Sequence, residues 1–548
     1  MRESYGLTLS HHPWMVRYSK DQDPSADVTS PLPLIDRRAF VAGGAASGLA
    51  ASQALVQQAL AQQPASTLAF LQSFMQEGTR FDANLVLEAA RALARRAFVA
   101  PSTALPDPFN ALNGESYGSI RAKQERRVWG DENRGIMLEP LHRGFVYTTA
   151  VSINLVENGL VRQLVYDARS FDFGKLNVPA NLPDIGYSGF RLLARDESSR
   201  EIASFQGATF FRSAAKGQGM GAMARALAVK TADPRGEEFP VFRIFWIEKP
   251  SNDDVIVIHA IADSASATTA FRFTLRTNDV TILDTEATIF TRVAMDHIGI
   301  APMQASFLFG PNKRRNIDDV RPAAYEVNGL QMLNGRGEWI WRPLNNPEQL
   351  QVSAFMDDNP RGFGLLQRER DFAAFQDDDQ HFELRPSLWI EPIGDWGPGS
   401  VHLVEIPSDA EINDNIIAFW RPAAALTAGS ETTFAYRQFW CWSPPEKPPL
   451  AQAIGFRVGR GSQARRRRCL VEFASDSLGP DHPGDIKLSL SVSPGQITAP
   501  RLLINPQRKT ARVSFELDPG NESAVELRLL LEQGDKPLTE TWLYRWTP

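Results

Sequence analysis

The chain is poor in cysteine, in long apolar runs and in net basic charge, and each shortage excludes a class of protein. Only two cysteines, Cys441 and Cys469, occur among 548 residues, so no dense disulfide framework holds the fold. Acidic residues outnumber basic ones by 64 to 58, which gives a net charge of −6. Nucleic-acid-binding surfaces carry a basic stripe, so we expect no nucleic-acid partner.

Familiar catalytic and metal-binding motifs are also missing. The eight histidines show no His-Glu-x-x-His spacing, and no Gly-x-Ser-x-Gly elbow is present. The acidic runs 357–359 and 377–379 lack the alternating ligands of a calcium loop, and solvated loops explain them better. We therefore expect neither a metal nor a cofactor.

Residues 1–61 have the layout of an export signal. The twin-arginine pair Arg37 and Arg38 precedes a weakly apolar run over 41–60, and Ala59-Leu60-Ala61 fits a small-x-small cleavage site. The run contains Gly, Ser and Gln, so we do not expect it to span a membrane. An ordinary helix with an arginine pair near its start is the alternative. The pattern favours export of a mature chain covering 62–548.

Export would bring the two cysteines into an oxidising compartment. A bridge between Cys441 and Cys469 is then chemically permitted, and both lie in or beside strand-like runs. Two separate buried thiols are the simpler interpretation, and both alternatives stay open here.

Most of the mature chain has the pattern of short strands. One helix is expected over 81–98, with Asp82 as its cap, and it ends before the proline-rich stretch 101–108. After it, runs with period-two alternation are bounded by Gly, Asn, Asp or Pro, for example over 241–247, 255–261 and 271–275. This pattern predicts an all-β fold made of antiparallel sheets in a large sandwich.

A composition change near 422–429 predicts a domain boundary. Beyond it, short strands are expected at 433–440, 470–473, 486–492, 511–517 and 524–531, which fits an immunoglobulin-like sandwich. The predicted organisation is a signal region (1–61), a large N-terminal β-sandwich (62–422), a linker (423–428) and a smaller immunoglobulin-like β-sandwich (429–548).

Residues 326–420 combine aromatic, carboxylate and amide side chains along strand-like runs, notably at 338–347, 361–367, 385–392 and 411–420. Aromatic faces cover the apolar sides of sugar rings, and carboxylates and amides bond the hydroxyls. These segments resemble the glucan biosynthesis protein D/G family (OpgD/OpgG) of osmoregulated periplasmic glucans, more closely its D branch. The resemblance extends from about Phe81 to Tyr544. It implies the same two-sandwich plan, a periplasmic location, a β-glucan substrate and an inner-membrane glucan synthase as a partner.

The resemblance also implies a pair of catalytic carboxyl groups. Asp414 matches the general acid of a Leu-Asp-Asn-Ile-type segment. A purely structural Asp-Asn turn that closes a strand is the alternative. Glu326 occupies the position of the general base, where the family has aspartate, and Asn328 replaces a second acid of that segment. A side chain one methylene longer can misplace a catalytic group. The family mechanism would be inverting, on β-1,2-glucan, with proton transfer through a substrate hydroxyl and ordered water.

Further candidates are supporting residues for substrate binding. Tryptophans in strands are more often core residues, and arginines are often plain ion-pair partners, so each has a structural alternative. The predicted set is Trp339, Trp341, Arg342, Asp371, Arg385, Trp389 and Trp396.

Two functions are compatible with these patterns. The first is a periplasmic enzyme that cleaves or transfers the glucan backbone. The second is a non-catalytic protein that binds glucan or acts as a scaffold beside the membrane synthase, and the changes at Glu326 and Asn328 are its main support.

Overall fold

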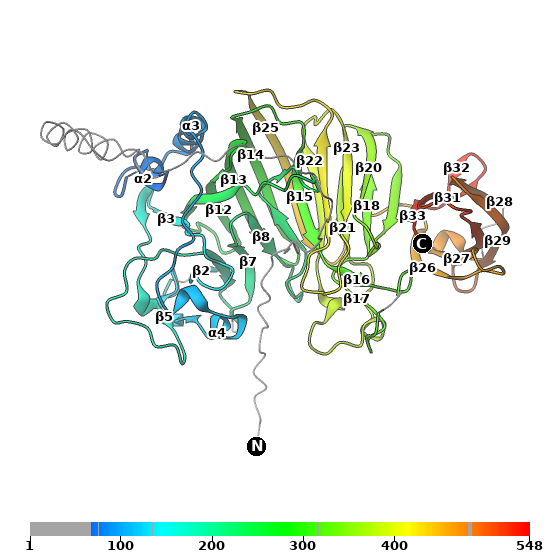
Figure 1. The fold of residues 1–548 in the computed structure, drawn as a ribbon, viewed down its shortest axis with the longest axis horizontal. Helices are drawn as coiled ribbons and strands as arrows, with labels where there is room; N and C mark the ends of the chain where they lie inside the picture. Colours follow the sequence, from blue (N-terminus) through cyan, green and yellow to red (C-terminus); the bar gives the residue numbers. More distant parts are fainter. Residues whose placement is uncertain (1–66, 75, 133–134, 197, 315–316, 481–484) are drawn as a thin grey trace, which may run out of the picture.

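The computed structural model describes residues 67–548, apart from 75, 133–134, 197, 315–316 and 481–484. The predicted signal region lies outside the described residues. In the described part of the chain, strands dominate, as predicted, and they form two large sheets and one small sheet (Figure 1).

The longest sheet runs through the whole molecule. Among the described residues it has fifteen strands, in the order β28 (Ile486–Ser493), β31 (Val525–Gln533), β33 (Thr541–Trp546), β19 (Trp339–Pro343), β18 (Gly329–Leu333), β21 (Gly362–Leu366), β22 (Ser387–Ile393), β25 (Glu431–Cys441), β14 (Thr281–Thr291), β13 (Ala267–Thr277), β12 (Val255–Asp263), β11 (Val241–Glu248), β3 (Ser152–Glu157) and β4 (Leu160–Gln163), with β32 (Lys536–Pro537) beside β31.

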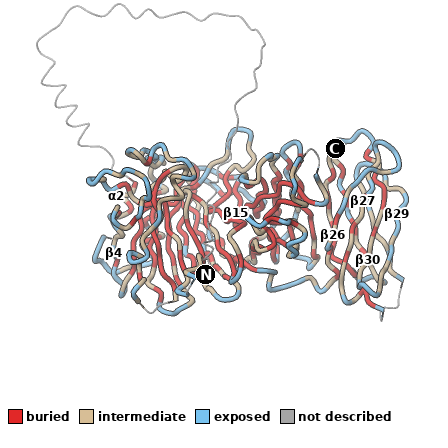
Figure 2. The backbone as a smooth tube through the Cα atoms, turned by 90° about the horizontal axis from the view of Figure 1, so that it is seen from below, coloured by how far each residue is buried: buried red, intermediate tan, exposed pale blue. Residues whose placement is uncertain are grey.

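The second large sheet packs against one face of the long sheet. Its ten described strands are β2 (Ile136–Leu141), β6 (Gly189–Ala194), β7 (Glu201–Gln206), β8 (Phe210–Ser213), β9 (Met223–Arg225), β15 (Ile298–Ala305), β24 (Ile416–Pro422), β23 (Pro398–Glu405) and β20 (Gln351–Asp358), with β10 (Ala228–Val229) beside β15. The main hydrophobic core fills the space between the two sheets, and Figure 2 shows this buried interior along the strands.

A four-stranded sheet covers the far end of the long sheet. It consists of β26 (Gln452–Arg460), β27 (Arg467–Ala474), β30 (Thr510–Asp518) and β29 (Gln496–Asn505). Its inward residues alternate with polar ones, as in Cys469, Val471 and Phe473 of β27, and they form a second core with β31 and β33. The two remaining described sheets are short pairs, β1 (Arg121–Ala122) with β5 (Phe171–Asp172), and β16 (Phe307–Phe309) with β17 (Ala324–Tyr325).

Helices are few and short in the described chain. They are α2 (Thr67–Gln72), α3 (Ala83–Ala94) and α4 (Gly114–Gly118), and 3-10 turns occur at Phe109–Ala111, Gln124–Arg126, Ala168–Ser170, Phe372–Ala374, Phe382–Leu384 and Asp476–Leu478.

The predicted helix near the start of the fold is α3. Asp82 caps it, because the Asp82 carboxylate accepts a hydrogen bond from the Asn84 N–H at 2.9 Å. Its apolar face packs with Ile244 and Trp246 of β11, whereas Phe245 and Ile247 point into the main core. Both faces of β11 are therefore buried, which explains its nearly continuous apolar sequence.

One strand differs in its placement from the prediction. The run 433–440 was expected in the C-terminal sandwich, but it belongs to β25, which pairs with β14 and β22 in the middle of the long sheet. A second departure is that β33 pairs in parallel with β19, so the long sheet continues into the small sandwich. The residue patterns that suggested strands were right, but pairing between distant segments decides which sheet each strand joins.

The two cysteines are separate buried thiols. Cys441 ends β25 and Cys469 lies in β27, and both are unbridged. Burial raises the pKa of each thiol to about 12. Of the two alternatives for these residues, the structure has the free thiols.

Candidate active site

Asp414 lies at the entrance of β24, two residues before the strand begins at Ile416. The next residue, Asn415, fastens this turn: the Asn415 side chain accepts from the Phe307 N–H at 2.8 Å and donates to the Phe307 and Ile406 carbonyls at 3.0 and 3.1 Å. The structural role predicted for an Asp-Asn turn thus falls to Asn415. The hydrogen bonds that hold the turn thus come from Asn415 and not from Asp414, which is buried with 4% of its surface exposed.

A chain of polar side chains from two strands and a loop holds one oxygen of Asp414. Gln304 of β15 donates to Asp414 Oδ2 at 2.6 Å, and Gln304 Oε1 accepts in turn from Arg225 Nε of β9. Arg225 is paired with Glu237 at 2.5 Å. The other oxygen, Asp414 Oδ1, is buried without a hydrogen-bond partner in the described structure.

Glu326 is the second buried carboxyl group of the site. It follows β17, and its N–H donates to the Ser306 carbonyl at 3.0 Å while Glu326 Oε2 accepts from the Ser306 N–H at 3.2 Å. Only 4% of Glu326 is exposed. The backbone of Ser306 therefore fixes both ends of this residue.

The two carboxyl groups influence each other electrostatically. Burial raises the pKa of Asp414 well above its ordinary value, and the negative charge of Glu326 raises it further. Burial also raises the pKa of Glu326, whereas the positive charge of Arg385 lowers it. Asp414 therefore holds its proton more strongly than an ordinary aspartic acid, and the charge of Glu326 is one reason.

Asp414 is in the wall of a pocket of about 510 Å³, which is lined by strands β7, β8, β9, β15 and β24 of the second large sheet and by neighbouring loops. Tyr147, Phe210 and Phe239 line the same pocket, and Phe239 is 43% exposed. Arg212 adds a positive charge, and it contributes to lowering the pKa of both carboxyl groups. A pocket with aromatic faces, hydroxyls and a carboxyl group suits a sugar chain.

Trp339 and Trp389 lie in the core, although they were predicted to contact substrate. Their rings stack on each other with centroids 6.0 Å apart, and both are at least 95% buried. Gly362 makes room for this packing, because a Cβ atom there would lie 2.2 Å from the Trp389 ring. A tryptophan facing a glycine on the next strand fills the gap that the glycine leaves.

Trp341 and Trp396 are also at least 94% buried. Trp341 lies over Gly329, and the Arg368 guanidinium covers its ring at 3.6 Å. Trp396 packs edge-on against Tyr436 and donates its indole N–H to the Ala435 carbonyl at 3.2 Å. Neither ring lies in the pocket of Asp414.

The predicted polar residues fall in three different places. Arg342 is buried in an ion pair with Glu405 at 3.2 Å, away from the two catalytic candidates. Asp371 is exposed and caps the turn Phe372–Ala374. Arg385 is the one whose charge acts on Glu326, and it is held there by Gln380 and the Met220 carbonyl.

Asn328 does not face the carboxyl pair. Its side-chain oxygen accepts from the Arg368 N–H at 3.2 Å, on the opposite side of the segment from Asp414. The replacement of an acid at this position therefore removes no charge from the immediate surroundings of Asp414.

Sequence reasoning missed Gln304, Arg225 and the aromatic residues of the pocket. They come from β15, β9 and β8 and from the loop before β11, so no local spacing connects them. The exposed Phe239, between Glu238 and Pro240 in a loop, was the one local signal, since an aromatic residue in such a loop is seldom core.

Two features are absent from the described residues. In that part of the chain no group of three or more His, Cys, Asp or Glu side chains could hold a metal ion. Within the same residues, every helix is too short or too polar to cross a membrane.

The fold and the pocket together define an all-β protein of packed sandwiches with a buried acidic pair beside an aromatic pocket. The family described as "Periplasmic glucan biosynthesis protein, MdoG" matches residues 81–546, and the chain belongs to this family. The family description places the protein in the periplasm, in glucan biosynthesis.

Curated relatives support the same assignment. Glucans biosynthesis protein G of Vibrio cholerae serotype O1 is 43% identical over 476 residues, which cover 85% of this chain and 87% of the relative. The protein of that name from Bradyrhizobium diazoefficiens is 43% identical over 480 residues, covering 86% and 95%. The one from Shewanella sp. (strain MR-4) is 43% identical over 484 residues, covering 86% and 88%. These relatives carry the G name, and the preference for the D branch gains no support from them.

Proposed function

We propose that this protein shapes the glucose backbone of a periplasmic glucan by inverting cleavage or transfer on a β-1,2-linked chain. The observation that carries the proposal is the buried pair of Asp414 and Glu326: Asp414 lines the pocket, its pKa is raised, and its Oδ1 has no hydrogen-bond partner in the described structure. Glycoside cleavage commonly uses two carboxyl groups, one to protonate the leaving oxygen and one to activate water.

In this mechanism Asp414 is the general acid. Its raised pKa favours the protonated form, and Gln304 bonds Oδ2, so Oδ1 is the oxygen that would meet the glycosidic oxygen. Phe210 and Phe239 would support the sugar rings, and the Arg225 guanidinium lies over both rings at 5.5 and 5.4 Å.

Glu326 is the general base, acting at a distance. It is not in contact with the open pocket, so it would take the proton of the attacking water through a substrate hydroxyl and an ordered water. This agrees with the relay that the family resemblance implies. Arg385 and Arg212 would keep Glu326 ionised until it accepts the proton.

The test is incubation of mature 62–548 with linear β-1,2-glucan, beside Asp414→Asn and Glu326→Gln, with chain length and reducing ends followed over time. We expect shorter chains for hydrolysis, or altered chains without new reducing ends for transfer. Asp414→Asn should lower the rate at least about a hundredfold, because general acid catalysis contributes that much or more. Unchanged glucan with the wild-type protein would reject the proposal.

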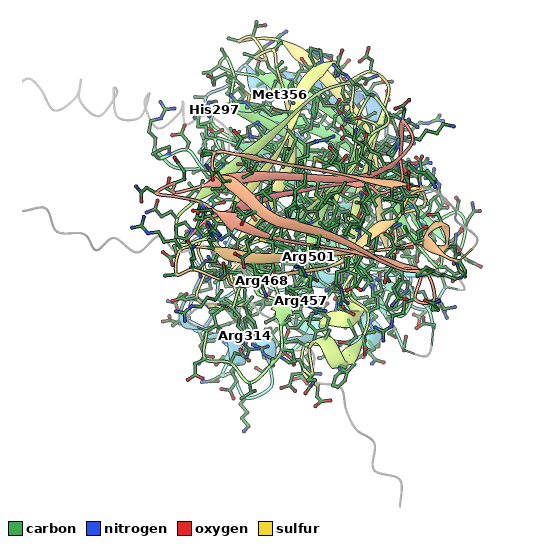
Figure 3. All side chains as sticks on the ribbon, turned by 90° about the vertical axis from the view of Figure 1, so that its right-hand side faces the viewer. His297, Arg314, Met356, Arg457, Arg468 and Arg501 are labelled. Carbon is green, nitrogen blue, oxygen red and sulfur yellow. The ribbon has the colours of Figure 1, made fainter. Side chains whose placement is uncertain are left out.

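The second candidate is a scaffold beside the membrane glucan synthase. It is favoured by the outer face of the four-stranded sheet, where Arg457 of β26, Arg468 of β27 and Arg501 of β29 lie on the same side (Figure 3). All three are exposed. Such a face suits an acidic partner surface.

The two functions separate by mutation. Under the scaffold hypothesis, Arg457→Glu with Arg501→Glu lowers glucan production in cells while Asp414→Asn leaves it unchanged. Under the enzyme hypothesis the two results are reversed.

A further inference from the structure

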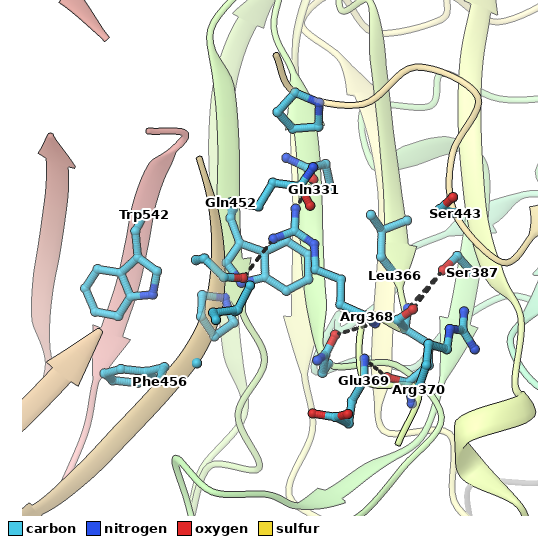
Figure 4. Close-up of a pocket in the computed structure, with 18 of the residues that line it drawn as sticks. Gln331, Leu366, Arg368, Glu369, Arg370, Ser387, Ser443, Gln452, Phe456 and Trp542 are labelled. Atoms are coloured by element: carbon cyan, nitrogen blue, oxygen red, sulfur yellow. Dashed lines mark hydrogen bonds between the residues drawn. The ribbon is translucent and has the colours of Figure 1, made fainter. Parts of the chain in front are cut away.

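A second, larger pocket of about 780 Å³ lies between the long sheet and the small sandwich. One wall comes from the loop after β21, another from β26 and β33, and the segment after β25 closes a third side (Figure 4). The volume is within the roughly 300–1,000 Å³ of small-ligand sites. It has no lining residue in common with the pocket of Asp414.

The floor of this pocket is rigid. Arg368 donates to both oxygens of the fully buried Glu540, at 2.7 and 3.0 Å, and also to the Ala453 carbonyl at 3.1 Å. Glu540 in turn accepts from the Ala453 N–H and from Gln331. The pocket is therefore built by the folded protein and does not need a partner to form.

The surfaces that face the pocket suit a sugar chain. Trp442 is 38% exposed, and its indole N–H is fixed by the Lys216 carbonyl at 3.2 Å, with the Arg370 guanidinium over the ring at 5.0 Å. Phe456, which is 9% exposed, lies on the side of the pocket away from Ser443, the residue after Trp442, and the buried Trp542 packs edge-on against it (Figure 4). Two aromatic walls separated by polar groups are the pattern that sandwiches hexose rings.

Two buried polar atoms of the lining have no hydrogen-bond partner in the described structure. They are the indole nitrogen of Trp542, on a side chain with 0% exposure, and Nε of Arg370. An unpaired buried donor carries a cost that a ligand hydroxyl would relieve.

The charges inside the pocket point to a neutral ligand. Arg368 is neutralised by Glu540, and Glu446 and Lys447 at the rim have opposite signs. Arg370, Arg457 and Glu369 also line the pocket, so its charges nearly balance, and a polyhydroxylated chain would find donors, acceptors and aromatic faces there.

The segment that carries Glu326 is the wall between the two pockets. Tyr325 and Asn328, on either side of Glu326, line the second pocket, while Glu326 itself acts on Asp414. A ligand in the second pocket therefore contacts the back of the catalytic segment.

We propose that this pocket is a second glucan-binding site, which holds a stretch of the chain away from the one being processed. The proposal rests on the proposed function for the nature of the ligand. It predicts that long glucan chains bind more tightly than short ones, because one chain can occupy both sites and the second contact becomes intramolecular.

The test measures binding stoichiometry in the Asp414→Asn protein, which does not consume its ligand. Short linear β-1,2-glucooligosaccharides are titrated calorimetrically into Asp414→Asn and into Asp414→Asn with Trp442→Ala or Gln452→Ala. We expect two sites per chain in the first protein and one in the Trp442→Ala protein, with affinity at the lost site reduced at least about tenfold. Leu503→Ala, which removes an exposed apolar side chain from the outer sheet of the small sandwich, is the matched control and should keep both sites.

A kinetic measurement gives the second readout. In otherwise wild-type protein, Trp442→Ala should raise KM for long glucan severalfold and leave KM for short chains near the wild-type value. Two sites in every variant, or equal KM values for long chains, would overturn the second site even if the wild-type protein processes glucan. If the wild-type protein leaves glucan intact but still binds two short chains, the second site stands and the catalytic proposal falls.

Discussion

Asp414 shows how a single residue is placed at the expense of stability. Its carboxyl group is buried, one oxygen is unbonded, and the charge of Glu326 raises its pKa. The unfolded chain would lose this proton near the ordinary value of 3.8, whereas the folded protein retains it to higher pH. Between these two pKa values the folded state binds more protons, so its stability falls as the pH rises.

Replacing Asp414 should therefore stabilise the protein at neutral pH. Asparagine can still accept from Gln304 but does not ionise, so Asp414→Asn should have a higher Tm than wild type at pH 7 and a smaller difference near pH 4. Thermal unfolding at the two pH values measures this. Glu286→Gln, an exposed change on β14, is the control and should show no such pH-dependent difference. An Asp414→Asn protein that is less stable than wild type at pH 7 would contradict the inference that the buried Asp414 carboxyl group destabilises the folded protein.

Gln304 affects the pH range over which Asp414 stays protonated. Its hydrogen bond favours the ionised carboxylate and lowers the pKa of Asp414. Gln304→Leu should raise this pKa further, moving the basic limb of the kcat/KM profile to higher pH and lowering the rate by about ten- to a hundredfold.

Gln351→Leu is the matched control for Gln304→Leu, because Gln351 is a buried glutamine of the same sheet, distant from the pocket of Asp414. Its pH–rate profile should coincide with that of the wild-type protein. A basic limb that stays in place in Gln304→Leu would show that Gln304 does not act on the catalytic acid.

At the scale of elements, the long sheet belongs to both sandwiches. β33 lies between β31 and β19, so the small sandwich is joined to the large one through main-chain pairing as well as through a linker. The side-chain ion pair between Arg368 and Glu540 also connects the two sandwiches at this junction. Loosening the junction should therefore affect the whole protein.

Glu540→Ala is expected to destabilise the protein by about 3–5 kcal/mol, since it leaves the Arg368 charge without its buried partner. Urea unfolding followed by fluorescence measures the loss. Glu286→Ala removes an exposed partner of Arg272 and should cost about 1 kcal/mol or less. Equal losses in the two variants would mean that the buried pair adds nothing to the junction.

The elements also show which features of the fold are predictable from the sequence. Period-two alternation and the cap at Asp82 predicted strands and the one amphipathic helix, because both signals are local. The placement of β25 was not predictable, because its partners β14 and β22 are far apart in the chain. The carboxyl pair came from motif resemblance, whereas Gln304 and Arg225 lie on separate strands and meet only in the fold. The four tryptophans predicted to bind substrate are buried, because the segments that match the family most strongly also supply core residues.

At the scale of the whole molecule, the two thiols sit in different sheets and can report on cooperativity. Cys441 is in the long sheet and Cys469 in the four-stranded one, and burial raises the pKa of both to about 12. Neither should react with a thiol reagent in the native protein, because the reactive thiolate is absent and access is blocked.

We expect both thiols to become reactive in a single transition as urea increases. Labelling followed by peptide mass spectrometry distinguishes Cys441 from Cys469, and Cys441→Ser and Cys469→Ser provide single-thiol controls. If Cys469 reacts at clearly lower urea than Cys441, the small sandwich opens independently and the shared sheet does not couple the two.

The junction of β19 with β33 also limits how such genes can recombine. Trp341 and Arg368 come from one part of the chain, while Ala453, Glu540 and Trp542 come from another, yet they meet in one contact network. A chimaera that joins the large sandwich of one relative to the small sandwich of another would have to inherit matching residues on both sides. The small sandwich is thus not an exchangeable cassette, and the two parts are expected to change together over evolutionary time.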